Sequence, residues 1–156
     1  MQFGRNGIHT ISAQAQNSFT SALFLIQIQG VSATAVTELA GIEVDVAVLT
    51  SREGTDLTSG QKQPGQASYT NLVVRRPLTK DLALWNWMQQ SVGGTASPAA
   101  ISVRLLDAQE QPVVIWTFKN AFPVKWTGPV FNALSNDIAI ETLEIAHSGF
   151  TIAAAT

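Results

Sequence analysis

Residues able to do acid-base, nucleophilic or metal chemistry are few in this chain and widely spaced. There are two histidines, His9 and His147, and no cysteine. Neither histidine lies near a set of carboxylate or imidazole ligands in the sequence, so no metal site is predicted. Without cysteine there is no thiolate site and no disulfide framework. The cysteine count therefore does not indicate whether the protein works in a reducing or an oxidising compartment.

Paired carboxylates are the next candidates, because two acids on one face can share general acid and base roles. Glu141 and Glu144 stand three residues apart in a segment that alternates like a strand, which directs them to opposite faces. No G-x-S-x-G turn presents a serine nucleophile, and no glycine-rich loop has the spacing that cradles phosphate. We therefore predict no catalytic residue, no cofactor and no enzymatic activity.

The composition indicates a protein that buries much of its surface by self-association. A chain of 156 residues fits a single domain, expected to span residues 1–156. It is 46% hydrophobic but only 13% charged, against about 25% charged in typical soluble domains. Ser, Thr, Gln and Asn can solvate part of the surface, and further copies of the chain can bury the rest. The net charge of −2 gives no basic footprint for nucleic acid.

The N-terminal region is expected to be an arm followed by a strand. Residues 1–19 have little periodicity and are predicted to form a flexible arm that orders only against a partner. The apolar run over 22–28 faintly imitates a secretory signal. Gln27 and Gln29 interrupt it with the period of a half-buried strand, however, and no segment approaches the length of a membrane span.

A second strand and a long loop come next. Residues 42–49 alternate with period two and predict a strand. Residues 50–68 hold three Gly and one Pro and are too long for an ordinary hairpin turn. Two interpretations stay open: a surface loop, or an excursion such as a hairpin that contacts a neighbouring subunit. Strand character returns over 69–76 and ends at Pro77.

One substantial helix is predicted over residues 80–92. Thr79 fits the N-cap position, Asp81 lies in the first turn, and Gly93-Gly94 ends the segment. An apolar stripe with spacings of three and four predicts the face that packs on a sheet, and it consists of Leu84, Trp85, Met88 and Val92. Trp87 points away from that stripe and is predicted to contact another subunit.

Four more strands are expected in the C-terminal half. Residues 101–106 and 113–119 predict a hairpin about the turn at 107–110, and two further strands cover 122–127 and 138–145. The total is about seven strands and one helix. This inventory predicts a mainly β, α+β fold, which is an antiparallel sandwich or barrel with one packed α-helix and a long loop or hairpin arm.

Short sequence motifs between Phe19 and Phe150 follow one another in an order and with a spacing typical of one structural family. In the first half they are Arg52-Glu53-Gly54, Pro64-Gly65, Tyr69, Asn71-Leu72, Leu84-Trp85 and Trp87. In the second half they are Trp116, Phe118, Asn120-Ala121, Pro123, Lys125-Trp126, Gly128-Pro129, Asn132-Ala133, Asn136, Ile140-Glu141, Leu143-Glu144 and His147. With these motifs the chain resembles the tail-tube proteins of contractile phages and of related extracellular contractile injection systems.

The resemblance implies a mechanical role. Subunits of this kind close into six-membered rings, and the rings stack into a hollow inner tube inside a contractile sheath, together with baseplate and tube-initiator proteins. On contraction the tube would pierce a target envelope, and its lumen would pass DNA or an effector protein. A ring subunit buries its sides and stacking faces, which gives the low charge a physical reason. The particle would be assembled in the cytoplasm as a phage tail, or as a phage-tail-like particle released from the cell.

The same resemblance assigns contacts between subunits to the long loop over 50–68, with Arg52, Glu53 and Lys62 as polar contacts. The sequence departs from the family at Pro77, where Gly more often follows the basic pair, and at Gln63-Pro64, where an apolar residue more often precedes the proline. These departures affect the expected contacts of the loop and leave the expected fold unchanged.

Three alternatives remain at this point. A tube-initiator or baseplate relative shares the fold but joins a single ring layer, and a tube of the type VI secretion kind is a further relative. A carbohydrate-binding sandwich belongs to a different class and would use exposed tryptophans as sugar platforms. Its candidates are Trp85, Trp87, Trp116 and Trp126. Most of them alternate with apolar neighbours, which favours burial in a core or an interface.

Overall fold

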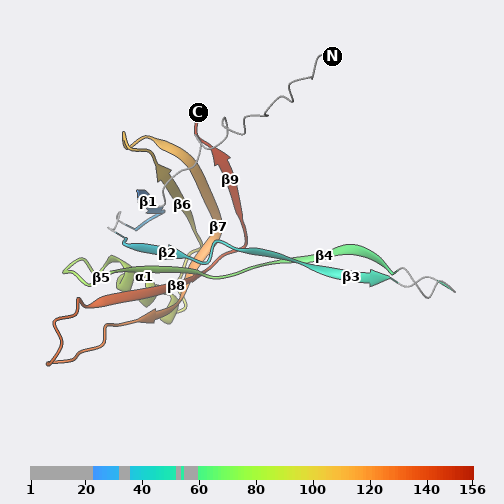
Figure 1. Ribbon diagram of the computed structural model, residues 1–156. Coiled ribbons are helices and arrows are strands. Elements are labelled where there is room, and N and C mark those ends of the chain that lie inside the picture. The colour runs from blue at the N-terminus through green and yellow to red at the C-terminus, as the bar shows by residue number, and fades with distance from the viewer. Residues whose placement is uncertain (1–22, 32–35, 52–53, 55–59) are drawn as a thin grey trace, which may run out of the picture.

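The computed structural model describes residues 23–31, 36–51, 54 and 60–156. The predicted N-terminal arm over 1–19 lies outside these residues. Within the described part the chain forms nine strands and one α-helix (Figure 1). In chain order they are β1 Phe24–Ile28, β2 Glu38–Ala40, β3 Val44–Ser51, β4 Gln61–Tyr69, β5 Leu72–Pro77, α1 Ala83–Val92, β6 Ala99–Leu106, β7 Pro112–Thr127, β8 Ile140–Ala146 and β9 Phe150–Ala154.

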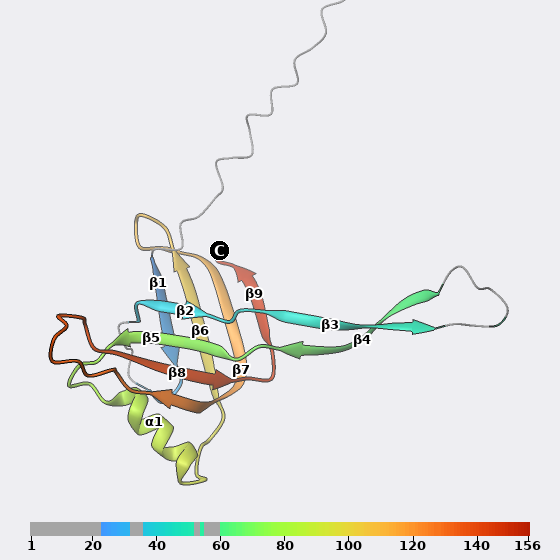
Figure 2. The same cartoon turned by 60° about the horizontal axis from the view of Figure 1, so that its bottom comes forward.

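Seven of the strands form one antiparallel system in two halves that share β7. The first half has β1, β6 and β7 side by side, with β9 on the other side of β7. The second half runs β7, β8, β5 and β2. Figure 2 shows the strands of the two halves crossing, with α1 along one end. The predicted fold class, a mainly β antiparallel structure with one helix and a hairpin, is confirmed.

Strand β7 serves both halves because it bends in the middle. It is 16 residues long, and Asn120 takes a φ of 52° at the bend. This left-handed conformation is one that Asn adopts more readily than most residues. The sequence predicted two strands here, over 113–119 and 122–127. That prediction was wrong at the break, because pairing with β6 continues past the bend to Ala121.

The hydrophobic core lies between the two halves and α1. On β5 and β8 every second residue is buried, which is the period expected of half-buried strands. The fully buried apolar side chains come from strands of both halves and from the helix, and include Leu72, Val74, Leu84, Ile101, Phe118, Leu143 and Ile145.

Helix α1 starts three residues later than predicted. Its N-cap position is Leu82, without a side-chain hydrogen bond, so Thr79 is not the cap. The Asp81 carboxylate instead accepts the Ala83 N–H at 3.0 Å. An Asp side chain that bonds a backbone N–H two residues on is a common way to begin a turn. The helix therefore begins at Ala83, the residue whose N–H bonds to the Asp81 carboxylate.

The prediction that Trp87 faces outward was wrong. Its side chain is 3% exposed and belongs to the core, whereas Val92, expected in the buried stripe, is 69% exposed. The observed inward face contains Leu84, Trp87 and Met88, which are three and four residues apart. Trp85 lies at its flank. The side chain of Trp87 is therefore almost fully covered within the chain, and its predicted contact with another subunit stays a prediction.

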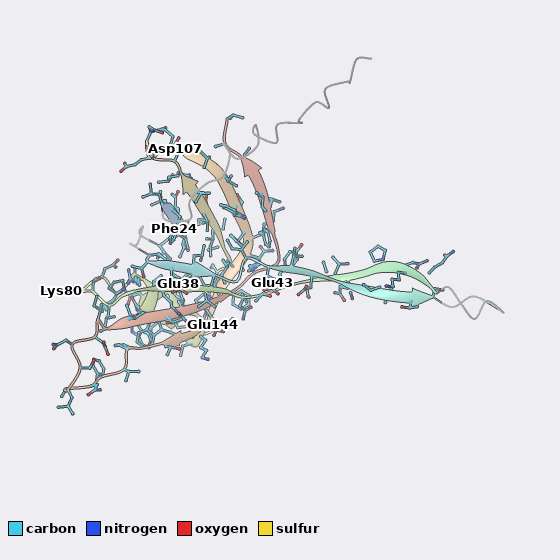
Figure 3. The ribbon with its side chains drawn as sticks, in the orientation of Figure 1. Phe24, Glu38, Glu43, Lys80, Asp107 and Glu144 are labelled. Carbon is cyan, nitrogen blue, oxygen red and sulfur yellow. The ribbon has the colours of Figure 1, made fainter. Side chains whose placement is uncertain are left out.

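Among the described strands, β3 and β4 pair only with each other and extend away from both halves of the sheet system as a hairpin, here called the arm (Figures 1 and 3). Of the two interpretations of residues 50–68, the hairpin excursion is the one observed. The predicted bounds were wrong at both ends, since β3 reaches Ser51 and β4 begins at Gln61. Pro64 lies within β4 beside a register shift opposite Val46 and Val48. Bulges and edge strands are where a strand accommodates proline, because no ladder hydrogen bond is lost.

Two short strands were not predicted. β2 pairs with β5 and β9 pairs with β7, and each lies at an edge. β2 has three residues, too few to show a period. β9 contains Ala153 and Ala154, and alanine is a weak strand former. Tertiary pairing rather than local preference forms both strands.

Candidate assembly surfaces

The most concentrated set of polar side chains is a buried cluster under α1. Arg76 of β5 and Glu141 of β8 are direct cross-strand partners whose side chains are 3% and 2% exposed, and Arg76 Nε donates to Glu141 Oε1. Arg76 Nη1 also donates to Asp81 Oδ2 at 3.0 Å. Trp126 Nε1 donates to Glu141 Oε2 at 2.9 Å. These bonds satisfy both buried charges and connect β5, β7, β8 and the start of α1.

This cluster has the properties of a structural ion pair. Glu141 uses both carboxylate oxygens in hydrogen bonds, and neither Arg76 nor Glu141 lines a pocket found among the described residues. Glu144 lies on the other face of β8, beside Lys125 at 3.9 Å. The prediction that Glu141 and Glu144 cannot act as a carboxylate pair is confirmed by this placement.

Asp81 is the half-exposed member of the cluster. The backbone N–H of Ala83, and after it the Arg76 side chain, lower the pKa of Asp81 below its ordinary value of 3.8. The Thr79 hydroxyl accepts the Asp81 N–H at 3.2 Å. Asp81 is therefore ionised at neutral pH, where it holds the first turn of α1 against Arg76.

His147 belongs to an aromatic group. Its Nε2 lies 2.9 Å from the carbonyl oxygen of Thr70, and its ring contacts the rings of Tyr69, Phe118 and Phe150 with centroids 5.0–6.2 Å apart. His9 lies outside the described residues. In the part of the chain that the structure describes, no three His, Cys, Asp or Glu side chains converge as metal ligands. In that part, too, no helix has the length and apolarity to cross a membrane.

None of the four tryptophans is an open platform. Trp87 is in the core, and Trp116 and Trp126 are half-buried against it. Trp85 packs edge-to-face on Trp126, with ring centroids 4.9 Å apart. The exposed aromatic surface on which a carbohydrate-binding function would depend is therefore not present at these positions.

The arm presents an apolar surface to solvent. Val44, Val46 and Val48 are 47%, 51% and 63% exposed, and their alternation places them on one side of β3, here called the valine face. Side chains stand out from the arm without a packed element beside them (Figure 3). Exposed valines in a row are unusual unless a partner covers them.

Lys62 lies on the valine face, near the end of the arm. It pairs with Thr50, which is two residues beyond Val48 on β3 and so has the same side. Lys62 is exposed and makes no ion pair with a described residue. Arg52 and Glu53, the other predicted polar contacts, lie outside the described residues. The predicted contact of Lys62 with another subunit stays a prediction.

A second exposed apolar surface lies on the loop over 128–139, which joins β7 to β8 and is here called the β7–β8 loop. Four of its side chains are between 73% and 98% exposed, namely Val130, Phe131, Leu134 and Ile138. The sequence analysis missed this surface. Its signal is a run of large apolar residues, after Gly128-Pro129, that follows neither the helical nor the strand period.

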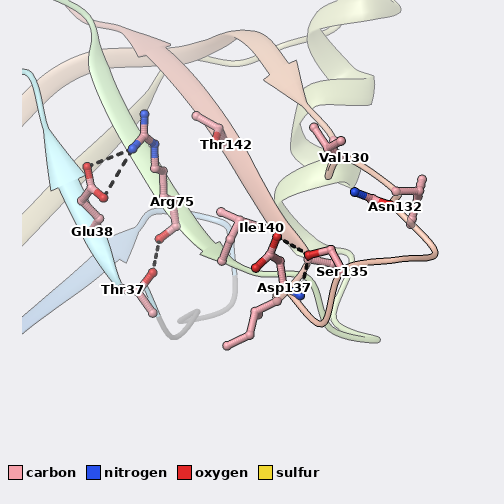
Figure 4. Close-up of a pocket in the computed structure, with 13 residues that line it drawn as sticks. Thr37, Glu38, Arg75, Val130, Asn132, Ser135, Asp137, Ile140 and Thr142 are labelled. Carbon is pink, nitrogen blue, oxygen red and sulfur yellow. Dashed lines mark hydrogen bonds and ion pairs between the residues drawn. The ribbon is translucent and has the colours of Figure 1, made fainter.

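The β7–β8 loop and the edge formed by β2 and β5 line a groove of about 630 Å³ (Figure 4). On the sheet side, Arg75 and Glu38 form an ion pair at 3.3 Å. On the loop side, the Ser135 hydroxyl donates to the Asp137 carboxylate. Asp137 is exposed and makes no ion pair within the described chain. The loop side of the groove therefore combines apolar side chains with one unneutralised anion, Asp137.

Several solved structures share this fold. A chain in an extracellular contractile injection system, from the PVC sheath-tube complex in its extended state, has a TM-score of 0.81 at 22% identity and covers 90% of this chain and 95% of that one. A chain in the anti-feeding prophage cap has a TM-score of 0.82 at 22% identity, with coverage of 96% and 100%. Hcp1 from Flavobacterium johnsoniae has a TM-score of 0.58 at 17% identity, with coverage of 85% and 96%.

The family follows from the sequence match rather than from these folds. No curated protein sequence matches the chain significantly. The family described as T4-like virus tail tube protein gp19 matches residues 20–151, which is most of the chain, and confirms the resemblance to tail-tube proteins. Proteins of this family are structural and not enzymatic. The chain, with its exposed arm, apolar loop and buried ion pair, belongs to the T4-like virus tail tube protein gp19 family.

Proposed function

We propose that this tail tube protein is the repeating subunit of the inner tube of a contractile tail or injection system. Six subunits close into a ring, and rings stack into a tube whose lumen passes DNA or an effector protein. Family membership supports this role. Similar chains occur in a sheath-tube complex, a baseplate and a tube-terminating cap, which supports a sheath and a baseplate as partners. The tube would be assembled in the cytoplasm into a phage tail or a released phage-tail-like particle.

The observation that carries this proposal is the unpartnered arm. A two-stranded hairpin alone is marginally stable in water, and β3 and β4 pair with no other strand that the structure describes. Burying a valine side chain contributes about 1.5–3 kcal/mol, and three valines stand exposed in a row on this hairpin. Contact with another subunit supplies the burial that the chain alone does not provide.

Edge strands give a second reason to expect lateral association. In the part of the chain that the structure describes, β1, β2 and β9 each pair with one strand, which leaves backbone groups on the other side of each. Such edges associate with other chains unless they are covered. Neighbouring subunits in a ring would cover them and close the system.

Substitution on the valine face tests the proposal. Val48→Asp places a charge in the proposed interface, and an unpaired charge that becomes buried is strongly unfavourable. Sedimentation velocity of the purified chain should show particles of at least six chains for the parent protein and single chains for Val48→Asp.

The matched control is Gln63→Asp, which adds the same charge on the opposite face of the arm. Gln63 pairs with Leu49, next to Val48. This variant should assemble like the parent. If Val48→Asp assembled as well as Gln63→Asp, the valine face would not be an assembly surface.

A further inference from the structure

The two exposed apolar surfaces lie at opposite ends of the molecule. In Figures 1 and 2 the arm extends away from one side of the sheets, and the β7–β8 loop projects from the other. The arm of a chain therefore does not reach that chain's own groove. Two different surfaces at opposite ends associate head to tail, which generates a ring if the rotation closes and a filament if it does not.

The arm and the groove also match in chemistry. The valine face is an apolar stripe with a cation, Lys62, near its end, and the arm's one described carboxylate, Asp45, lies on the opposite face. The groove has an apolar wall, which includes Val130, Phe131 and Ile138. Arg75 and Glu38 neutralise one another there, so Asp137 is the charge that remains.

Complementary charge selects one register of the arm in the groove. A lysine that enters beside an aspartate gains an ion pair, and opposite charges steer the encounter of the two chains. An apolar arm with a carboxylate at this position would meet a like charge, and like charges across an interface suppress association. Lys62 and Asp137 thus determine which register of the arm is favoured, and the valines and the loop provide the buried apolar area.

We propose that the groove beside the β7–β8 loop receives the valine face of the arm of a second copy of this chain, with Lys62 of the incoming arm paired to Asp137. This proposal rests on the proposed function and names the surface that the arm contacts. Each subunit then donates one arm and accepts another. An open row of subunits has an unfilled groove at one end and an unfilled arm at the other, and a closed ring has neither.

A charge exchange tests the pairing. The variants are Lys62→Asp, Asp137→Lys and the double variant, all at exposed positions, and circular dichroism checks that each remains folded. Either single variant should raise the concentration needed for half-assembly by about tenfold. The double variant, in which the charges are exchanged, should return it close to the parent value.

Mixing the two single variants provides a stricter test. The aspartate arm of one fits the lysine groove of the other, and the remaining arm and groove keep their original charges, so an equimolar mixture should assemble with alternating subunits. If neither the double variant nor the mixture assembles better than the single variants, the pairing is wrong. If Asp137→Lys assembles like the parent, another protein or none occupies the groove. Failure of the parent chain itself to assemble would instead contradict the proposed function.

Discussion

Arg76 and Glu141 connect the second half of the sheet system, β7, β8, β5 and β2, to the start of the helix through charges that are removed from water. Their ion pair is buried, and Asp81 and Trp126 complete its hydrogen bonds. Removing one partner of a buried pair leaves the other charge uncompensated, which destabilises a protein by about 3–5 kcal/mol. At the scale of single residues, this cluster is the site where a small substitution has the largest predicted effect on folding.

The substitution Glu141→Gln keeps the shape of the side chain and removes its charge. It should lower the free energy of unfolding by about 3 kcal/mol, measured by urea unfolding in the Val48→Asp background, where assembly is not expected to contribute. Glu144→Gln is the matched control, since it makes the same change on the exposed face of the same strand. Its pair with Lys125 spans 3.9 Å and is partly exposed to solvent, so the expected effect is within about 0.5 kcal/mol. Equal losses for the two variants would show that burial of the Arg76 pair does not determine stability.

At the scale of elements, the bend in β7 lets one strand join both halves of the sheet system. Asn120 occupies a backbone conformation that a β-branched residue adopts with strain. Asn120→Val should therefore cost about 1–3 kcal/mol, again measured by urea unfolding in the Val48→Asp background.

Two comparisons isolate the conformational part of that cost. Asn120→Gly fits the positive φ and should be less destabilising than Asn120→Val. Lys119→Val introduces the same side chain at the preceding exposed position, where φ is not positive, and should have little effect. If the Gly and Val variants lost the same stability, backbone strain at the bend would be excluded as the cause.

The elements that the sequence predicted are those with a strong local signal. Strand alternation in 101–106 and 138–145 and the apolar spacing near 84–88 gave β6, β8 and α1 with small shifts of their ends. β2 and β9 could not be predicted, because they are formed by pairing with distant strands. Trp87 was misplaced because two overlapping stripes fit the helical period, and only the packing of α1 on the sheet decides between them.

The assembly surfaces were less predictable than the fold. A hairpin excursion was one of two interpretations of residues 50–68, but the extent of the arm was not predicted. Gln61–Tyr69 forms a strand because it pairs with β3, and local strand propensity does not indicate this pairing. The sequence analysis gave the β7–β8 loop no structure except the start of the strand predicted over 138–145, and its exposed apolar residues were not recognised. Exposure depends on what the rest of the chain leaves uncovered, which a linear pattern does not show.

At the scale of the whole molecule, one chain leaves surfaces that other subunits would cover. These surfaces are the sheet edges and the two apolar ends, and the low charge of the chain fits their burial. Only 13% of its residues are charged, and large apolar side chains remain exposed on the arm, the β7–β8 loop and β9. A chain with so much exposed apolar surface is expected to associate. Stacking subunits in closed rings would bury these surfaces without leaving an open end around the ring.

Negative-stain electron microscopy of the purified full chain tests the tube proposal most directly. Closed six-membered rings that stack into hollow tubes are the predicted result. Rings that never stack would identify a tube-initiator or baseplate subunit of the same fold. Single chains at every concentration and salt condition examined would contradict the proposal that this protein builds a tube.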